Sequence, residues 1–390
     1  MTSRQRMIAA LSHQSPDYVP CSFMLFNGLK STCKDYEEFI EKQIALGLDP
    51  YVQIPARPPV VVNDWYNLHG LPVHFDAAVQ TNEWVENRDN ERWPMLVKEY
   101  HTPAGTLRAE VKKDETWRWG NHVPFFDDYL ESRSIKFILT GEEDLDAIQF
   151  LLPAPTPQEI QDFKEEAKPA IALAKKHDLL LAGGWGIGVD SLAWLYGLKN
   201  MMFASYDKPE FLKTILEMVA KWNRARMQVI LDAGIDLYIK RAWYENCDFW
   251  SPKTYRKFVE PILREDAKLA HKNGVKFGFI VSSNCMPLLE IYADAGVDTL
   301  IGVDPRGWDM AAAKRKIGNK VCLWGGINGH LTMEMDSPQN VQAEAETAFK
   351  VLAPGGGFIL SPVDNVREWT PTAEQNTKAL IDSWKKLRAA

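Results

Sequence analysis

The chain has 390 residues, 46% of them hydrophobic, and a formal net charge of −7, which is an ordinary composition for a soluble globular protein. The mild acidity and the lack of a basic run argue against nucleic acid as a partner. The five cysteines are scattered, with no Cys-x-x-Cys pair, so neither a zinc ribbon nor a disulfide framework is indicated. No apolar run approaches the roughly 20 residues of a membrane span, and the start does not resemble a signal peptide. We therefore expect a cytoplasmic protein that binds neither nucleic acid nor membrane.

The N-terminal third combines a short opening helix, two strands and a segment of different character. The strands are "YVPCSFML" (18–25) and "DPYVQIP" (49–55), both short and apolar. Residues 82–121 alternate in polarity and carry Pro-Ala-Gly in the middle, which predicts an antiparallel hairpin.

From about residue 178, short apolar runs alternate with helical stretches. Six runs are expected to be buried strands: "DLLLAGGW", "IDLYIKRAWY", "VKFGFIVS", "DTLIGVD", "KVCLWGGI" and "GGFILSPV". With the two N-terminal strands they make eight β/α units, so the sequence predicts a (β/α)8 barrel. Residues 1–390 are expected to be one domain, with 82–121 as a hairpin insertion over one end of the barrel. The alternative is a doubly wound open sheet, but "GGWGIG" (183–188) has neither the dinucleotide nor the phosphate-loop pattern.

In such barrels the active site lies where the strands end. The polar and aromatic residues at those ends are Trp185, Arg241, Tyr244, Glu245, Ser282, Ser283, Asn284, Cys285, Asp304, Arg306, Asn328, His330, Asp364 and Asn365. Glu245 is the sharpest candidate, because aromatic neighbours disfavour an ionised carboxylate unless a cation is near. Arg241 offers that cation in a plain structural ion pair. Glu260, just before Pro261, is the second carboxylate, and its alternative is an ordinary surface residue.

These stretches resemble the uroporphyrinogen decarboxylase superfamily. The resemblance is carried by "DSLAWLYGLKNMMFASYDKPEFL", "AGIDLYIKRAW", "SPKTYRKFVEPIL", "PLLEIYADAGVDTL", "KVCLWGGIN" and "GGGFILSP", from about residue 180 to the C-terminus. The fold that it implies is a (β/α)8 barrel. The decarboxylases carry an Arg-rich N-terminal loop for substrate carboxylates, but the matching stretch "CSFMLFNGLKSTCK" lacks Arg. The resemblance therefore favours the other branch, the corrinoid-dependent methyltransferases.

Members of that branch that demethylate aryl methyl ethers have Glu, fourteen residues, Glu, twenty residues, His. Glu245 and Glu260 fit the first spacing, and Val281 stands where the His is expected. The resemblance implies a zinc site with Glu245 and Glu260 as ligands. The place of the His is open to Cys285, four residues on, or to His330 or Asp364 from neighbouring strands. The alternative without metal has the glutamates as acids of raised pKa.

The activity that the resemblance implies is transfer of a methyl group from a methoxylated, aromatic substrate to the cobalt of a separate corrinoid protein. The expected catalytic residues are Glu245, Glu260, Tyr244 and His330. The expected substrate-binding residues are Met24, Phe26, Trp185, Arg241, Trp243, Ser283, Asn328 and Asp364. The alternatives are a tetrapyrrole decarboxylase, a methyltransferase for a thiol or an amine, and a non-catalytic relative that binds an aromatic ligand.

Overall fold

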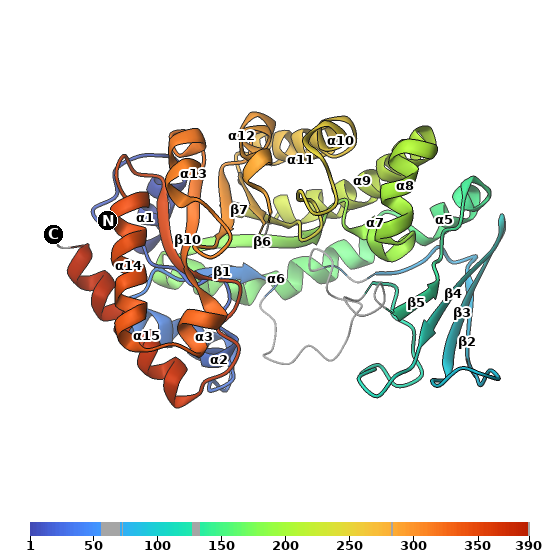
Figure 1. Cartoon of the computed structure of the whole chain (residues 1–390), viewed down its shortest axis with the longest axis horizontal. Coiled ribbons are helices and arrows are strands. Elements are labelled where there is room, and N and C mark those ends of the chain that lie inside the picture. The colour runs from blue at the N-terminus through green and yellow to red at the C-terminus, as the bar shows by residue number, and fades with distance from the viewer. Residues whose placement is uncertain (56–70, 72, 127–132, 282–283, 389–390) are drawn as a thin grey trace.

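The computed structural model describes residues 1–390 except 56–70, 72, 127–132, 282–283 and 389–390. In this part of the chain, seven parallel strands form one curled sheet in the order β1-β6-β7-β8-β9-β10-β11 (Figure 1). The strands are β1 (Tyr51–Ile54), β6 (Leu180–Ile187), β7 (Leu237–Arg241), β8 (Lys276–Ile280), β9 (Thr299–Val303), β10 (Cys322–Asn328) and β11 (Phe358–Val363). Every residue of β9 and β11 is buried, which explains why the strands read as continuous apolar runs.

The predicted strand 18–25 lies between β11 and β1, but it pairs only through isolated bridges. Cys21 bridges Leu360 of β11 in parallel, and the carbonyl of Cys21 accepts a hydrogen bond from the backbone N–H of Asp49 at 2.8 Å. Pro20 has no N–H to donate, and the N–H of Met24 donates to Ser361 Oγ rather than to a strand carbonyl. This segment takes the place of an eighth strand, so the (β/α)8 prediction is confirmed, with one irregular unit.

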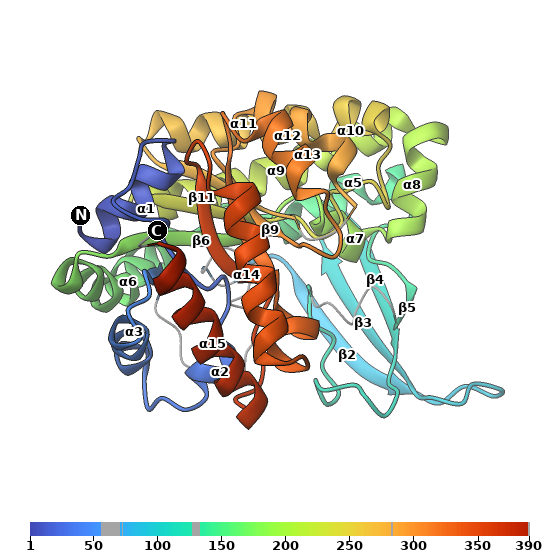
Figure 2. The same cartoon turned by 60° about the vertical axis from the view of Figure 1, so that its left-hand side comes forward.

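Helices connect the strands and cover the outside of the sheet (Figure 2). The α-helices are α1 (Ser3–Leu11), α2 (Asn27–Lys30), α3 (Tyr36–Ala45), α5 (Leu145–Ile148), α6 (Pro157–His177), α7 (Ser191–Leu195), α8 (Leu198–Asp207), α9 (Pro209–Leu231), α10 (Pro252–Phe258), α11 (Glu260–Lys272), α12 (Leu289–Ala295), α13 (Met310–Ile317), α14 (Pro338–Leu352) and α15 (Pro371–Leu387). Single turns of other helix types are η2 (Glu142–Asp144), η3 (Gln149–Leu151), η4 (Met286–Leu288) and η5 (Gly329–Glu334). No helix in the described residues has both the length and the apolar character needed to cross a membrane.

The inside of the barrel holds its own apolar cluster. Leu180, Ile239 and Trp324 point inward from their strands, and Met7 of α1 packs against them. Helix α1 therefore closes the end where the strands begin, and α7 follows β6 at the opposite end (Figure 1). That arrangement leaves the carboxyl ends of the strands as the mouth of the barrel.

The insertion is larger than the predicted hairpin 82–121. Its four antiparallel strands are β2 (Gln80–Glu86), β3 (Met95–Thr102), β4 (Gly105–Lys112) and β5 (Ser134–Lys136), in the order β2-β3-β4-β5. The central hairpin β3–β4 turns at the predicted Pro-Ala-Gly. An isolated hairpin is marginally stable, and here β2 and β5 add one strand on each side of it. The division into one domain of residues 1–390 stays a prediction.

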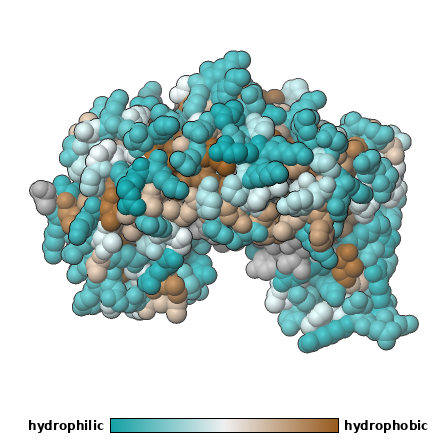
Figure 3. All heavy atoms as spheres, turned by 45° about the horizontal axis from the view of Figure 1, so that its top comes forward, coloured by the Kyte–Doolittle hydropathy of each residue, from teal (hydrophilic) through white to brown (hydrophobic). Residues whose placement is uncertain are grey.

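A chain of aromatic side chains joins this sheet to the barrel. Tyr100 of β3 contacts Phe125 at 6.1 Å between ring centroids, and Phe125 contacts Phe126 at 4.4 Å. Phe126 then stacks on Trp222 of α9 at 5.8 Å and meets Trp194 of α7 edge-on at 6.4 Å. The sheet thus lies beyond the mouth of the barrel, and Figure 3 shows the molecular surface hollowed between the lobe with this sheet and the lobe with the C-terminal helices.

Candidate functional site

Two strand ends carry unusual backbone. Trp185 in β6 has φ +62° and Asp364 directly after β11 has φ +66°. Such values are uncommon in residues other than glycine and are strained for a bulky side chain such as Trp. Strained residues cluster at functional sites, where the surrounding structure holds them. Both lie at the mouth and both were predicted to bind substrate.

Glu245, in the loop after β7, is fully buried beside a second carboxyl group, that of Asp190 after β6. The Oε1 atom of Glu245 accepts a hydrogen bond from the N–H of Val189 at 2.7 Å. Oδ1 of Asp190 accepts one from the N–H of Tyr244 at 3.1 Å. The other oxygens of the two carboxyls, Oε2 and Oδ2, have no hydrogen-bond partner among the described residues. We call Asp190 and Glu245 the carboxyl pair.

The electrostatics of the carboxyl pair favour its protonated form. Burial raises the pKa of Asp190 well above its usual range, and the neighbouring Glu245 raises it further. Burial also raises the pKa of Glu245, although the charge of Lys240 opposes this. Two buried carboxyls in contact with one another's charge resist double ionisation. The pair can therefore hold a proton at a pH where an exposed carboxyl has lost it.

A buried lysine in β7 places positive charge beside the carboxyl pair. Lys240 of β7 is 3% exposed, and its Nζ lies 2.9 Å from Asp266 Oδ2 and 4.0 Å from Glu245 Oε1. Asp266, on α11, also pairs with Arg224 at 3.1 Å. The backbone makes room for this contact at Gly188, because a Cβ there would overlap both Glu245 Oε1 and the Lys240 side chain. The predicted cation, Arg241, lowers the pKa of Asp190 through its charge.

The aromatic residues beside Glu245 are partly buried. The guanidinium of Arg241 lies 3.9 Å from the centroid of the Trp243 ring. Tyr244 meets Trp194 at 5.7 Å and Phe249 at 5.4 Å. Tyr244 thereby forms the last link of the aromatic chain that runs from the antiparallel sheet to the mouth.

Glu260 lies apart from the carboxyl pair. Helix α10 ends at Phe258, and Glu260 begins α11, as the following Pro261 favours. Its carboxylate pairs with Arg256 at 3.2 Å and with Arg264 at 2.6 Å. Among the described residues no ion pair or hydrogen bond joins it to Glu245. The geometry is that of a helix-surface ion pair, and its predicted catalytic role stays a prediction.

A second polar cluster lies after β10 and β11. Asn328 donates from Nδ2 to both oxygens of Asp304 at 3.1 Å. His330 lies 2.8 Å from Glu334 through its Nδ1 atom, and Arg367 pairs with the same carboxylate at 2.9 Å. Although burial opposes it, these hydrogen bonds lower the pKa of Glu334 to about 2. His330 is half exposed and belongs to this cluster.

Asp364 lies beside the same cluster, and burial raises the pKa of its carboxyl. The structure therefore brings three of the predicted residues, Asn328, His330 and Asp364, into one group. No hydrogen bond or ion pair links that group to the carboxyl pair within the described residues. The two form separate polar centres at the mouth.

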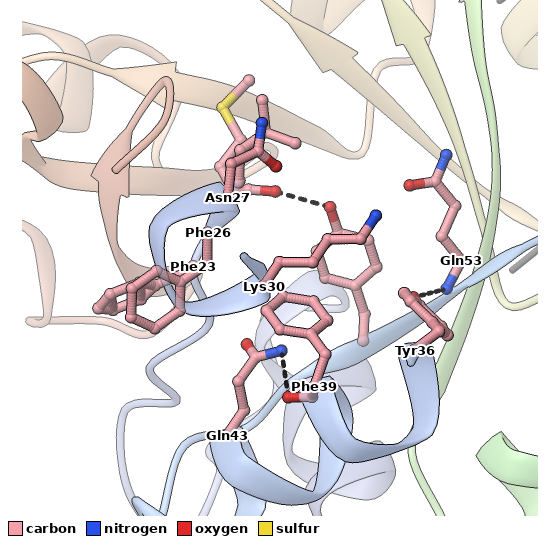
Figure 4. Close-up of a pocket in the computed structure, with 11 residues that line it drawn as sticks. Phe23, Phe26, Asn27, Lys30, Tyr36, Phe39, Gln43 and Gln53 are labelled. Carbon is pink, nitrogen blue, oxygen red and sulfur yellow. Dashed lines mark hydrogen bonds between the residues drawn. The ribbon is translucent and has the colours of Figure 1, made fainter. Parts of the chain in front are cut away.

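Met24 and Phe26 line a cavity of about 70 Å³ beside β1 (Figure 4). Phe26 is 2% exposed and packs on Phe23 at 4.2 Å and Trp369 at 5.6 Å. Met24 belongs to the inner cluster of the barrel, to which Trp185 adds its ring. Met24 and Trp185 thus lie in one apolar cluster and Phe26 lies in the surrounding core, and their binding of substrate stays a prediction.

The predicted zinc ligands do not come together. Glu260 is held by two arginines, and the buried thiol of Cys285 has its pKa raised by burial and by Cys247, so it is a poor thiolate ligand. Within the described residues no group of three His, Cys, Asp or Glu side chains has metal-binding geometry. A catalytic zinc takes three protein ligands, so the described residues do not fit it. Ser283, predicted to bind substrate, lies outside the described residues.

Asp190 and Lys240 were missed by the sequence prediction. Both had a signal: Asp190 follows the strand in "GIGVDS", and Lys240 is a charge inside the apolar run "DLYIKRAW". A lysine in a strand buried on both faces needs a buried carboxylate as partner. That requirement points to an acidic cluster nearby, although it does not say which acids form it.

A closed parallel β/α sheet with titratable groups gathered at the carboxyl ends of its strands defines a barrel of the enzyme type. The family model described as "Uroporphyrinogen decarboxylase (URO-D)" matches residues 143–387, more than half of the chain. The chain belongs to the uroporphyrinogen decarboxylase family, as its sequence predicted.

The similar curated proteins are methyltransferases. "Methylcobamide:CoM methyltransferase MtaA" from Methanosarcina barkeri is 26% identical over 195 residues, which cover 49% of this chain and 56% of the relative. The same protein from the strain Fusaro gives the same identity and coverage. The chain thus spans little more than half the length of these relatives. The likeness to the corrinoid-dependent methyltransferase branch, predicted from the sequence, is confirmed.

A solved structure shares the fold along the whole chain. The "methyltransferase from Methanosarcina mazei" superimposes with a TM-score of 0.58, covers 99% of both chains and is 19% identical. At that identity the likeness speaks for the fold alone.

Proposed function

We propose that this protein is a corrinoid-dependent methyltransferase that demethylates a methoxylated, aromatic substrate. The observation that carries the proposal is the carboxyl pair, Asp190 and Glu245, with both pKa values raised. The family and the methyltransferase relatives support the reaction class. The reduced cobalt of a corrinoid on a partner protein supplies the group that accepts the methyl.

The chain's own residues serve the oxygen that loses the methyl group. As the methyl–oxygen bond breaks, the oxygen keeps the bonding electrons, so a phenolate forms unless a proton reaches it. A protonated carboxyl can supply that proton. Glu245 is the donor in this scheme, and Asp190 shares the pair's proton with it. Trp185 and Met24 offer apolar surface for the ring.

In this proposal, the second polar centre binds the substrate, and exposed apolar side chains near it bind the partner protein. His330, Asn328 and Asp364 contact polar substituents of the substrate. Close by on η5, Leu331 is 48% exposed, and Met335 just after it is 65% exposed. Exposed apolar side chains at a functional mouth are typical of an interaction surface, here for the corrinoid protein.

The direct test is methyl transfer from methoxyaromatics. Purified protein with reduced cobalamin and 4-methoxyphenol is expected to yield methylcobalamin, followed by absorbance, and an equal amount of hydroquinone, followed by chromatography. Thiol and amine methyl donors serve as comparison, because they test the nearest alternative activity. Methyl transfer only from a thiol or an amine, or no transfer from any donor, would contradict the proposal.

A second prediction concerns metal. Because the predicted ligands are not assembled, we expect chelation with EDTA to leave the transfer rate within twofold of the untreated protein. Added zinc should not raise the rate. Loss of activity on chelation, restored by zinc, would mean that ligands outside the described residues complete a site with Glu245 or Glu260.

A further inference from the structure

The described residues that line a cavity beside β1 include one cation and no acid. It lies between the segment after Cys21, helices α2 and α3, and β1 (Figure 4). The residues that line it are Phe23, Met24, Leu25, Phe26, Asn27, Lys30, Tyr36, Phe39, Gln43, Tyr51 and Gln53. Lys30 is the sole charged member of this set. The cavity therefore has a net positive lining, enclosed by aromatic rings.

The ammonium of Lys30 has no acidic partner among the described residues. No carboxylate oxygen there lies within ion-pair distance, and the one interaction of Nζ is with the face of the Tyr36 ring, 5.6 Å from its centroid. Burial lowers the pKa of Lys30. By contrast, the neighbouring Lys34 is exposed and lies 3.9 Å from Asp35. A half-buried, unneutralised ammonium is costly unless an anion joins it.

Amide side chains line the cavity together with Lys30. Figure 4 shows the side chains of Asn27 and Gln53 on either side of Lys30. Neither side-chain amide makes a hydrogen bond to another described residue, whereas the N–H of Gln53 donates to Tyr36 Oη at 2.9 Å and so fixes that wall. Amide N–H groups and an ammonium are the donors that a carboxylate needs for both of its oxygens. The cavity volume of about 70 Å³ holds a few water molecules, which suits a carboxylate group.

The position of the cavity ties it to the site. Met24 and Tyr51 line the cavity and also belong to the apolar cluster inside the barrel, where Trp185 lies. Strand β1, beside the cavity, pairs with β6, and β6 pairs with β7, which leads to Glu245, so those two outer strands lie about 10 Å apart at the usual strand spacing. That span suits a benzene ring with substituents at both ends.

We infer that Lys30 binds the carboxylate of the substrate, so that the substrate is a methoxylated aromatic acid. The inference rests on the proposed function for the methoxy end. The evidence for the carboxylate end of the substrate is the cavity alone. A site with Lys30 in this role distinguishes aromatic acids from neutral methoxyarenes of the same shape.

The test is binding, which needs no methyl transfer. Calorimetry at pH 7 compares 4-methoxybenzoate with its neutral isostere 4-methoxybenzamide. The wild type is expected to bind the acid at least tenfold more tightly. Lys30→Met should abolish that preference, and Lys30→Arg should keep most of it. Lys34→Met, which removes an exposed lysine four residues away, should bind as the wild type does.

Equal binding of acid and amide by the wild type, no binding of either, or an undiminished preference in Lys30→Met would overturn the inference. Circular dichroism checks that each variant is folded, and Lys30→Gln replaces Lys30→Met if the latter is not. The outcome is separable from the proposed function. Preferential binding of the acid without methyl transfer would support the role of the cavity and contradict the proposed function. Methyl transfer from neutral ethers without preference for the acid would support the proposed function and contradict the role of Lys30.

Discussion

Replacing Glu245 with Gln is expected to lower the rate of methyl transfer roughly 10²–10⁴-fold, the range of a lost general acid. The amide keeps an oxygen that can accept the Val189 N–H, so the loop should stay in place. What it loses is the proton for the leaving oxygen. The rate is measured as methylcobalamin formed in a single turnover, which excludes product release.

The nature of the leaving group makes the test specific. With 4-nitroanisole the leaving phenolate is stable without a proton, so Glu245→Gln should lose much less rate than with 4-methoxyphenol. Glu265→Gln, an exposed glutamate on α11, is the matched control and should behave as the wild type. An equal loss with both substrates would show that Glu245 acts on structure or on metal rather than as an acid.

The pH dependence of methyl transfer follows from the raised pKa values of the carboxyl pair. The carboxyl pair is active while it holds a proton, and burial raises the pKa of both members. Activity should therefore persist above the usual carboxyl range near pH 4 and fall as the pH rises through the raised value of the pair. Glu245→Gln should remove this fall. A rate that increases over the same range would mean that the ionised pair is the active form.

The fold could be predicted because its signals are local. Buried parallel strands read as apolar runs, and hydroxyl-Pro pairs mark where helices begin. Thr156 caps α6 together with Glu159, and Ser251, Ser337 and Thr370 cap later helices, all as the sequence indicates. The hairpin at 82–121 was recognised for the same reason, but the short β5 carries too little pattern to be seen.

The candidate site could be predicted only in part, because its contacts join separate strands. The burial of Glu245 followed from its aromatic neighbours. Its partners Asp190 and Lys240 come from other positions along the chain, and sequence spacing does not measure those distances. Glu260 is the reverse case: its spacing of fourteen residues from Glu245 could be read from the sequence, whereas the two arginines that hold its carboxylate could not.

Lys240→Met is expected to destabilise the protein by about 3–5 kcal/mol, the cost of removing one partner from a buried charged group. Lys240 is 3% exposed and is held between Asp266 and Glu245. Met fills a similar volume but removes the cation that Asp266 and Glu245 share. The free energy of unfolding is measured from urea titrations, with the slope checked for two-state behaviour.

The matched control is Lys268→Met on the exposed side of α11, where the ion pair with Glu265 lies in solvent. Exposed pairs of this kind contribute little, so its unfolding curve should overlay that of the wild type. A second variant, Lys240→Met with Asp266→Asn, removes one of the orphaned charges and should recover part of the loss. If Lys240→Met alone were as stable as the wild type, the carboxyls around it would have to be protonated already.

The pH dependence of the free energy of unfolding shows whether the carboxyls around Lys240 are ionised or protonated. The charges of Asp266 and Glu245 raise the pKa of Lys240 although burial opposes them, so its contribution is complete below the ordinary lysine value near 10.4 and is lost only at higher pH. In the variant, Glu245 lacks the cation that opposes the rise of its pKa, so the folded state is penalised where the same carboxyl ionises in the unfolded chain, above about pH 4. The difference between wild type and variant should therefore narrow as the pH falls below 4. Because the same lysine opposes protonation of Glu245, its loss should also move the fall in methyl transfer to higher pH, which ties the stability of the buried charges to the acid that the reaction needs.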